Sequence, residues 1–331
     1  MVRKNVILKD ISERTGFTIN TVSRALKNKP DISDATIKLI KETAEEMGYI
    51  GNSIAGALRS GMTKTIAVIL GDISNPHFSI LVKEIERTAR TDNYTTIILN
   101  TDENDELERE AINSALSKKV DGIILCPTQK SKENIWYLMS TSIPFVLIGR
   151  YFKDIETDYV VCDDTKGGYL ATKYLIDKGH VRILFLNGPK YISSAAERHE
   201  GYKKALSESG VKYDHALIRE ISITSGSNKR IIKKIITDEV KFTAIFAFSD
   251  MIAWETAHVL NEFSYKIPGD IDIVGFDNIQ SKLMFPPKLT SIKTHKTTMS
   301  KRAVAVLLMK INKKDTGLKN EVIGVEVEIR N

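Results

Sequence analysis

Apolar and polar positions alternate along most of this chain in a regular way. From residue 65 onward, short continuous apolar runs alternate with segments in which apolar residues recur every three or four positions. The first pattern predicts buried strands and the second amphipathic helices. Their alternation predicts parallel sheets covered by helices on both faces. Because the pattern restarts near residue 160, we expect two doubly wound lobes with a cleft between them. The predicted strands are 65–70, 95–99, 122–125, 145–148, 182–186, 243–248 and 271–276, and the predicted helices are 79–90, 106–118, 167–178, 195–209 and 249–263.

The first 50 residues show helical periodicity alone. A short amphipathic helix begins near Leu8, and Gly16 supplies the permissive backbone of a tight turn. Thr18 stands where the N-cap of a second helix is expected, and Ser33 caps a third helix that ends before Gly48. Two short helices joined by a glycine turn are typical of a helix-turn-helix.

The second helix divides into an apolar face and a polar face. Val22, Ala25 and Leu26 share the apolar face, so Ile19, Asn20 and Arg24 fall on the opposite one. Asn can bond adenine, Arg can bond guanine, and an aliphatic side chain can contact a thymine methyl group in the major groove. The spacing also fits an ordinary three-helix domain without any role in nucleic-acid binding. The candidate DNA-contacting residues here are Thr18, Ile19, Asn20, Thr21, Ser23 and Arg24.

Residues 50–64 form a short segment that fits two interpretations. Asn52 or Ser53 provides a helix cap, and Ile54 and Leu58 share one face. A helix this short is marginal by itself in water, and Gly56 weakens it by a further ~1 kcal/mol relative to Ala. The segment is therefore either a plain linker or a helix that folds when something orders it, with Asn52 and Leu58 as further candidate DNA contacts.

Polar and aromatic side chains follow the predicted strands, and in the second half of the core they include the segments Ser193-Ser194 and Ser249-Asp250. Ligands of parallel sheets bind outside the carboxyl ends of the strands, so these residues are candidates for a site in the cleft. Carboxylates accept hydrogen bonds from hydroxyl groups, an Arg side chain donates two parallel hydrogen bonds, and a Phe ring packs on a sugar ring. This combination of side chains suits a polyhydroxylated effector. The candidate effector-binding residues are Asn75, His77, Phe78, Arg150, Asp163, Arg198, Asp250 and Asp277.

Each of these candidates also has a purely structural interpretation. Arg198 could pair with Glu197 or Glu200, Asp250 could cap a helix, and Asn75 with the following proline could form a turn. Cys126 follows a predicted strand and has two interpretations, a residue that lines the cleft or, by preference, a small buried hydrophobe.

Composition and charge narrow the class of protein. The net charge is +6, and residues 1–30 hold seven of the basic and only two of the acidic side chains, so a basic head precedes a nearly neutral body. Two cysteines provide no disulfide framework, and no apolar run approaches the length of a membrane span. The N-terminus shows no signal-peptide core, which predicts a cytoplasmic protein.

Enzymatic motifs do not occur. The sequence contains no phosphate-binding GxxxxGK[ST] loop, no GxGxxG, no HExxH and no GxSxG. The six His and two Cys lack metal-ligand spacing. We therefore expect no catalytic residues, no metal site and no cofactor.

Five motifs in order along the chain resemble the lactose-repressor/galactose-repressor family of bacterial transcription regulators. They are Leu8-Lys-Asp-Ile-Ser-Glu-Arg-Thr-Gly, Thr21-Val-Ser-Arg-Ala-Leu-Lys-Asn, Ala44-Glu-Glu-Met-Gly-Tyr, Ala57-Leu-Arg-Ser-Gly and Asp72-Ile-Ser-Asn-Pro-His-Phe. The resemblance implies an all-α helix-turn-helix head and an α/β core with two parallel-sheet lobes of the periplasmic-binding-protein type. It also implies that 51–64 become a hinge helix in the minor groove, where Leu58 wedges into a base step.

The resemblance also has consequences for particular residues and boundaries. It matches the effector-holding Arg and Asp of the family to Arg198-His-Glu-Gly201 and Gly275-Phe-Asp277. Gly51 and Gly56 depart from the Pro and the basic residue that the family often has, which makes hinge folding harder. The implied domains are 1–50, 51–64 and 65–331, with a first lobe of 65–162 and 292–320 and a second lobe of 163–291 and 321–331.

These observations predict a homodimeric repressor that binds double-stranded operator DNA and responds to a small effector, a sugar by preference. A nucleobase or a partner protein could replace the sugar within the same class. Outside it, a transport-type sugar-binding protein is disfavoured by the basic head, and a metabolic enzyme is disfavoured by the lack of a chemical motif.

Overall fold

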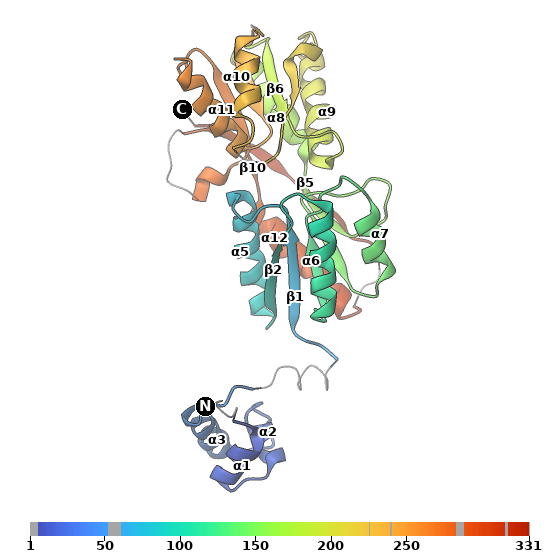
Figure 1. Cartoon of the computed structure of the whole chain (residues 1–331), viewed down its shortest axis with the longest axis vertical. Coiled ribbons are helices and arrows are strands. Elements are labelled where there is room, and N and C mark those ends of the chain that lie inside the picture. The colour runs from blue at the N-terminus through green and yellow to red at the C-terminus, as the bar shows by residue number, and fades with distance from the viewer. Residues whose placement is uncertain are drawn as a thin grey trace. The chain divides into compact units, whose positions relative to one another are not determined.

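The computed structural model describes residues 6–51, 61–224, 226–238, 240–282, 288–314 and 317–330. The chain divides into two compact units, Met1–Thr63 and Lys64–Asn331, which are described separately (Figure 1). We call the first unit the head and the second the core. The described residues of the core include no helix long and apolar enough to cross a bilayer, and neither do those of the head.

The head is a three-helix domain built as the periodicity predicts. Its helices are α1 (Leu8–Thr15), α2 (Ile19–Ala25) and α3 (Asp34–Glu46). Thr18 and Ser33 cap α2 and α3 by accepting hydrogen bonds from the backbone N–H groups of Thr21 and Thr36. Gly16 and Gly48 take left-handed φ values of 75° and 68° at the two turns. The buried core of the head consists of Ile11, Val22, Ala25, Ile40 and Ala44.

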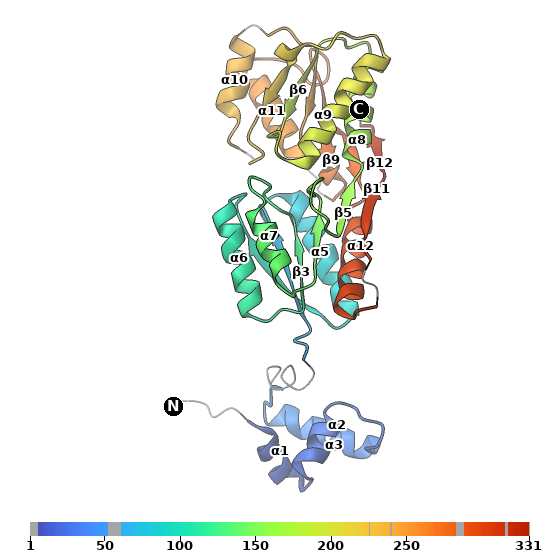
Figure 2. The same ribbon diagram turned by 90° about the vertical axis from the view of Figure 1, so that its right-hand side faces the viewer.

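The first lobe contains a sheet in which all six described strands are parallel. The strand order is β11-β5-β4-β3-β1-β2, and helices cover both faces (Figure 2). The strands are β1 (Thr65–Leu70), β2 (Thr95–Asn100), β3 (Gly122–Leu125), β4 (Phe145–Ile148), β5 (Tyr159–Cys162) and β11 (Asn320–Ile323). The helices are α5 (Pro76–Thr91), α6 (Asp105–Ser117), α7 (Glu133–Ser140) and α12 (Lys296–Ile311).

The second lobe repeats this architecture with one difference. Its order is β12-β10-β9-β8-β6-β7, and only β12 runs antiparallel to its neighbour. The strands are β6 (Ile183–Asn187), β7 (Ile218–Glu220), β8 (Ala244–Ala247), β9 (Asp272–Asp277), β10 (Thr290–Thr294) and β12 (Val325–Glu328). The helices are α8 (Asp164–Asp177), α9 (Ser193–Glu208), α10 (Lys229–Thr237) and α11 (Asp250–Glu262), with short 3₁₀ turns at His215–Leu217 and Ile279–Lys282. The predicted fold class is confirmed for both lobes.

The chain passes between the lobes three times in the described residues, after β5, after β10 and between β11 and β12. The first crossing lies at the predicted boundary near residue 162. The other two lie later than expected, because β10 stays in the second sheet through Thr294 and β11 stays in the first sheet through Ile323. Helix α12 follows a second-lobe strand yet packs against α5 in the first lobe. Strands β5, β7, β10, β11 and β12 and helices α7, α10 and α12 were not predicted.

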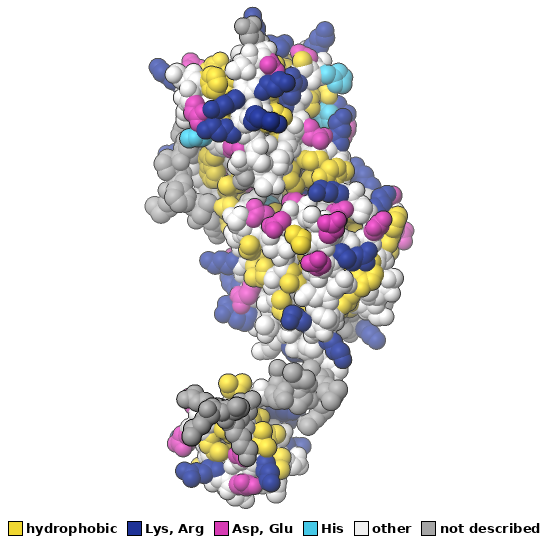
Figure 3. Space-filling model, in the orientation of Figure 1, with side chains coloured by type: hydrophobic (Ala, Val, Ile, Leu, Met, Phe, Trp, Pro, Cys, Tyr) yellow, Lys and Arg dark blue, Asp and Glu magenta, His cyan; other side chains and the backbone are white. Residues whose placement is uncertain are grey.

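Lys and Arg side chains gather on the second lobe over α10, as Figure 3 shows. Two of them, Lys229 and Lys233, form ion pairs with Glu262 at 2.6 and 2.7 Å. Hydrogen bonds from these two ammonium groups lower the pKa of Glu262 to about 2. This basic surface is therefore partly neutralised by its own carboxylate.

Two glycines let α8 and α9 approach each other closely. A Cβ atom at Gly201 would lie 2.0 Å from the carbonyl oxygen of Thr165, and one at Gly168 would lie 2.2 Å from that of Arg198. Both contacted oxygens belong to the backbone, so neither can move away without displacing its helix. This close packing fixes the position of Arg198, which lies on α9.

We expect Gly201→Ala to destabilise the core by about 1–3 kcal/mol, because the added methyl group forces the two helices apart. Denaturant unfolding followed by circular dichroism measures the effect. Gly324→Ala is the matched control, since a Cβ there meets nothing within 4 Å. Equal stability of the two variants would contradict the close-packing argument.

Candidate functional site

A cavity of about 60 Å³ lies between the two lobes, at the carboxyl ends of their parallel strands. Both lobes contribute to its walls. The first lobe provides α5, α12 and the segments after β2, β3 and β4, and the second provides α9, the segments after β7 and β8, and the end of β9. Six predicted residues line it. They are Asn75, His77, Phe78, Arg150, Arg198 and Asp277.

Arg198 in the cavity wall is held by hydrogen bonds and by aromatic rings. Its Nε donates to Oδ1 of Asp164 at 2.8 Å, and its Nη1 donates to the carbonyl oxygen of Phe248. The guanidinium also lies 3.5 Å from the ring centroid of Phe276 and 4.5 Å from that of Phe248. Both Arg198 and Asp164 are buried, so each charge depends on the other for compensation. Arg198 therefore pairs with neither of the two neighbouring glutamates considered from the sequence.

Arg150 forms a second ion pair on the opposite wall. Its Nη1 and Nη2 donate to the two carboxylate oxygens of Glu103 at 2.7 and 2.9 Å, a bidentate arrangement. Nη1 also donates to the carbonyl oxygen of Pro127 at 3.0 Å. Both guanidinium groups in the cavity lining are thus matched by carboxylates.

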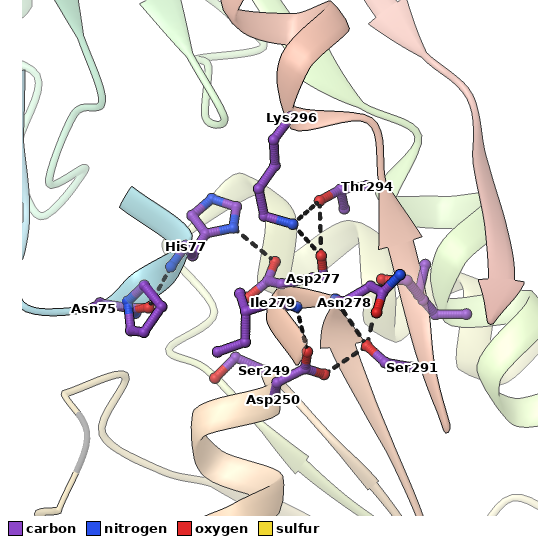
Figure 4. A network of polar contacts seen from close by, with 12 residues as sticks. Asn75, His77, Ser249, Asp250, Asp277, Asn278, Ile279, Ser291, Thr294 and Lys296 are labelled. Atoms are coloured by element: carbon purple, nitrogen blue, oxygen red, sulfur yellow. Dashed lines mark hydrogen bonds and ion pairs between the residues drawn. The ribbon is translucent and has the colours of Figure 1, made fainter. Parts of the chain in front are cut away.

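His77 and Asp277 meet across the cavity, His77 from the start of α5 and Asp277 from the end of β9 (Figure 4). The distance from Nδ1 of His77 to Oδ1 of Asp277 is 3.1 Å. Burial raises the pKa of Asp277, but the charges of His77, Lys296 and Arg198 outweigh it and the net direction is downward. Asp277 also has a left-handed φ of 104°, which turns the chain sharply at the end of the strand. Asn75 caps α5 by accepting from the N–H of His77, so its turn interpretation and its place in the cavity both hold.

Asp250, which was predicted as an effector contact, does not line the cavity. It is completely buried, where its carboxylate accepts from the hydroxyl of Ser291 at 2.5 Å and from the N–H of Ile279 at 2.8 Å. Figure 4 shows it on the far side of Asp277 from His77. The cap of α11 is Ser249 and not Asp250. Asp250 thus stabilises the backbone segment that carries Asp277.

Burial, followed by the nearby charge of Asp277, raises the pKa of Asp250 to about 7. A Cβ at Gly275 would lie 2.3 Å from Oδ1 of Asp250, so the carboxylate rests directly on the backbone of β9.

Asp163 also lies outside the cavity lining. Its carboxylate caps α8 by accepting from the N–H of Lys166 at 2.9 Å. The next residue, Asp164, turns inward and pairs with Arg198 instead. One position at the start of the helix therefore decides which of the two adjacent carboxylates pairs with Arg198.

Several lining residues were not predicted as effector contacts. Glu103 follows β2, so the rule that located the other candidates could have found it as well. Ser194 and Ser249 lie in segments to which that rule already pointed. Met299 had no such signal, because only the packing of α12 on the first lobe brings it to the cavity. The remaining lining residues are Leu81, Cys126, Ile148, Gly149, Cys162, Ile223 and Phe248.

The two lobes are also joined by hydrogen bonds beside the cavity. The side-chain oxygen of Gln129 accepts from the N–H of Ser193 at 3.0 Å and thereby caps α9 from the other lobe. The N–H of Tyr151 donates to Oγ of Ser193 at 3.2 Å, and its hydroxyl donates to Oε1 of Glu197 at 2.5 Å. The Gln129 amide group in turn donates to the carbonyl oxygen of Tyr151 at 2.7 Å. We refer to Gln129, Tyr151, Ser193 and Glu197 as the interlobe latch.

In the head, α2 exposes the residues that the sequence singled out. Thr18, Ile19 and Asn20 are exposed, and Ile19 retains 48% of its surface even though it is a large apolar residue. Thr21, Ser23 and Arg24 are partly exposed on the same helix. Asn52 and Leu58 lie outside the described residues.

The fold and the cavity define a class of protein, in which a helix-turn-helix head is joined to a two-lobed core of the periplasmic-binding-protein type. Residues 7–52 match the family model described as bacterial regulatory proteins of the lacI family. Residues 63–330 match the model described as periplasmic binding proteins and sugar binding domain of the LacI family. The chain therefore belongs to the lacI family. It is a transcription repressor with a DNA-binding head and an effector-binding core, as the sequence predicted.

Relatives of known name agree with this assignment. Catabolite control protein A of Priestia megaterium is 32% identical over 310 residues, covering 93% of each chain. The HTH-type transcriptional regulator DegA of Bacillus subtilis (strain 168) is 34% identical over 286 residues, covering 86% of this chain and 85% of its own. The solved lac repressor dimer bound to operator and the anti-inducer ONPF has a TM-score of 0.86 at 21% identity, with 98% of each chain covered, and supports the fold.

We expect the stability of the core to fall as pH rises from about 5 to 7.5, and Asp250→Asn to flatten this fall. The folded state holds a proton on Asp250 up to a pKa of about 7, whereas an unfolded Asp releases it near pH 4. Folding is therefore favoured below pH 4 and loses this contribution between the two values, by roughly 1–3 kcal/mol over this range. Urea unfolding at a series of pH values measures the slope. Asp163→Asn, which preserves a helix cap, is the control, and an unchanged slope in Asp250→Asn would refute the assignment.

We expect Tyr151→Phe to loosen the interlobe latch. Hydrogen exchange at the N–H groups of Tyr151 and Ser193 should quicken by about tenfold, because a hydrogen bond to a charged group is worth about 1.5–3 kcal/mol. Tyr137→Phe is the matched control, since the Tyr137 hydroxyl donates to Asn113 within the first lobe at 2.8 Å. If both variants exchange alike at the latch, the latch does not hold the lobes together.

Proposed function

We propose that this repressor works as a homodimer whose affinity for a palindromic operator is set by an uncharged, polyhydroxylated effector, a sugar, bound between the lobes of the core. The observation that carries the choice of effector is the charge balance of the cavity. Arg150 and Arg198 are each already matched by a buried or half-buried carboxylate. A phosphorylated effector would have to compete with Glu103 or Asp164 for its cation, whereas a neutral polyol can bond to the paired groups without adding charge.

The cavity also provides the apolar surface that a sugar ring needs. Phe78 from one lobe and Phe248 from the other line it, next to hydroxyl groups of Ser194 and Ser249. Apolar walls with a few convergent polar groups are typical of small-molecule sites. The solved complex of the transcriptional regulator CelR with cellobiose has a TM-score of 0.75 and 23% identity to this chain, covering 98% of it and 99% of its own.

The dimer follows from the size of the DNA-binding surface. One short helix such as α2 buries too little surface for specific binding, so two heads must dock on two half-sites. An effector that binds one arrangement of the lobes more tightly than the other then shifts operator affinity. Such coupling is typically about 1–3 kcal/mol, or about 5–150-fold.

The full chain should select palindromic sites from a randomised duplex library, and fluorescence anisotropy should then show a shift in operator affinity on addition of neutral sugars. Sugar phosphates and purines form the comparison panels. Response only to phosphates or purines would overturn the choice of effector, and failure to select any preferred duplex would overturn the DNA-binding role. Sedimentation in the absence of DNA tests the dimer.

We expect Arg198→Lys to lower affinity for the effector by about tenfold or more while leaving operator affinity without effector unchanged. Lys keeps a positive charge beside Asp164, but it lacks the planar guanidinium that donates several hydrogen bonds and stacks on two phenyl rings. Arg198→Ala is a poorer test, because it would strand the buried carboxylate of Asp164. Isothermal titration calorimetry with the sugar found above measures the loss. Equal loss of effector and operator binding would contradict separate sites.

A further inference from the structure

Arg24 on α2 is held by an aspartate of its own domain. Its Nε donates to Oδ2 of Asp31 at 2.8 Å, and its Nη2 lies 2.5 Å from Oδ1. The side chains are 44% and 49% exposed, so the pair lies at the surface, where DNA can reach it. The hydrogen bond with Asp31 raises the pKa of Arg24, and the same bond lowers the pKa of Asp31, so both groups remain charged.

Backbone hydrogen bonds after α2 hold the segment that carries Asp31 next to Arg24. After α2 ends, the chain folds back so that the N–H of Lys29 donates to the carbonyl oxygen of Arg24 at 3.1 Å. The N–H of Ile32 donates to the carbonyl oxygen of Lys29 at 3.1 Å, and Ile32 packs against the core of the head. Asp31 therefore stands beside Arg24 as a preformed acceptor.

The geometry of this pair leaves half of the guanidinium available. A guanidinium is planar and has two edges that can each make a bidentate contact, Nε with Nη2 and Nη1 with Nη2. Asp31 takes the first edge, and the second edge has the donor spacing that matches O6 and N7 of guanine. Because the carboxylate fixes the plane, Arg24 loses less side-chain freedom when it binds a base.

The carboxylate also discriminates against the DNA backbone. A phosphate that approached Arg24 would face the negative charge of Asp31, whereas the edge of a guanine carries no net charge. Repulsion of the wrong partner is a common source of specificity.

We propose that Asp31 is a specificity-determining residue, which orients Arg24 so that its Nη1–Nη2 edge reads one guanine in each operator half-site. The inference rests on the proposed binding of a palindromic operator. It assigns Arg24 to base reading and not to phosphate contact, and it gives Asp31 a positioning role.

The test uses the full chain and the duplex that it selects from a randomised palindromic library. Each symmetric pair of base pairs is replaced in turn, and dissociation constants are measured by anisotropy. For the wild type, replacing the G·C pair read by Arg24 should weaken binding by about 5–150-fold. In Asp31→Asn this penalty should fall at least fivefold at that position alone, while affinity for a random duplex stays equal or rises.

Three further variants separate orientation from charge. Arg24→Lys should lose the same preference, and the double variant Asp31→Asn/Arg24→Lys should lose no more than Arg24→Lys does, because the two residues act as one unit. Asp31→Glu, which keeps the charge, should restore part of the preference. Glu42→Gln on α3 is the matched control, since it removes a negative charge from an exposed pair with Lys38 and should leave the base profile unchanged.

The outcomes distinguish this inference from the function on which it rests. If the wild type selects a duplex and Asp31→Asn retains the full penalty at every position, the positioning role is wrong. A uniform change at all positions would assign Arg24 to the phosphate backbone and overturn the inference as well. If the wild type selects no duplex, the proposed DNA-binding function fails, and the inference fails with it.

Discussion

The site between the lobes depends on one constraint, which is that a buried guanidinium must be matched by a carboxylate. Arg198 and Asp164 lie on neighbouring helices that can approach only because Gly168 and Gly201 have no side chains. Two phenyl rings then stack on the same guanidinium. This arrangement places a rigid donor at the cavity without leaving an uncompensated charge. The choice of a neutral effector follows from it.

The head uses the same chemistry in a different environment. There the Arg24–Asp31 pair lies at the surface, so it contributes little to stability. Its consequence concerns orientation: one edge of the guanidinium is occupied and the other is left for a ligand. A buried pair and an exposed pair thus perform different tasks, because solvent screening removes the energetic value of the second but not its geometry.

The two lobes meet through contacts that surround the cavity. At the cavity, His77 of the first lobe contacts Asp277 of the second. Beside the cavity, the residues of the interlobe latch join the lobes, and Gln129 of the first lobe caps α9 of the second. An effector that bridges both lobes would add to these contacts, and an arrangement without them would lose several hydrogen bonds together. Such grouped contacts favour discrete arrangements of the lobes over continuous deformation. Asp250 fixes the backbone around Asp277 through its hydrogen bonds with Ser291 and Ile279.

Local patterns determined the three helices of the head, seven strands and five helices of the core, the caps Thr18 and Ser33, and the class of the fold, because apolar periodicity and capping act over a few neighbouring residues. The rule that ligands bind beyond strand ends located Asn75, Arg150, Arg198 and Asp277 at the cavity. Tertiary structure alone decided that Asp164 and not Asp163 turns inward, that Asp250 is buried beneath the site, and that α12 brings Met299 to the first lobe. These outcomes depend on which helix packs where and on which charge finds a partner. Such contacts join residues far apart in the chain, and no local pattern encodes them.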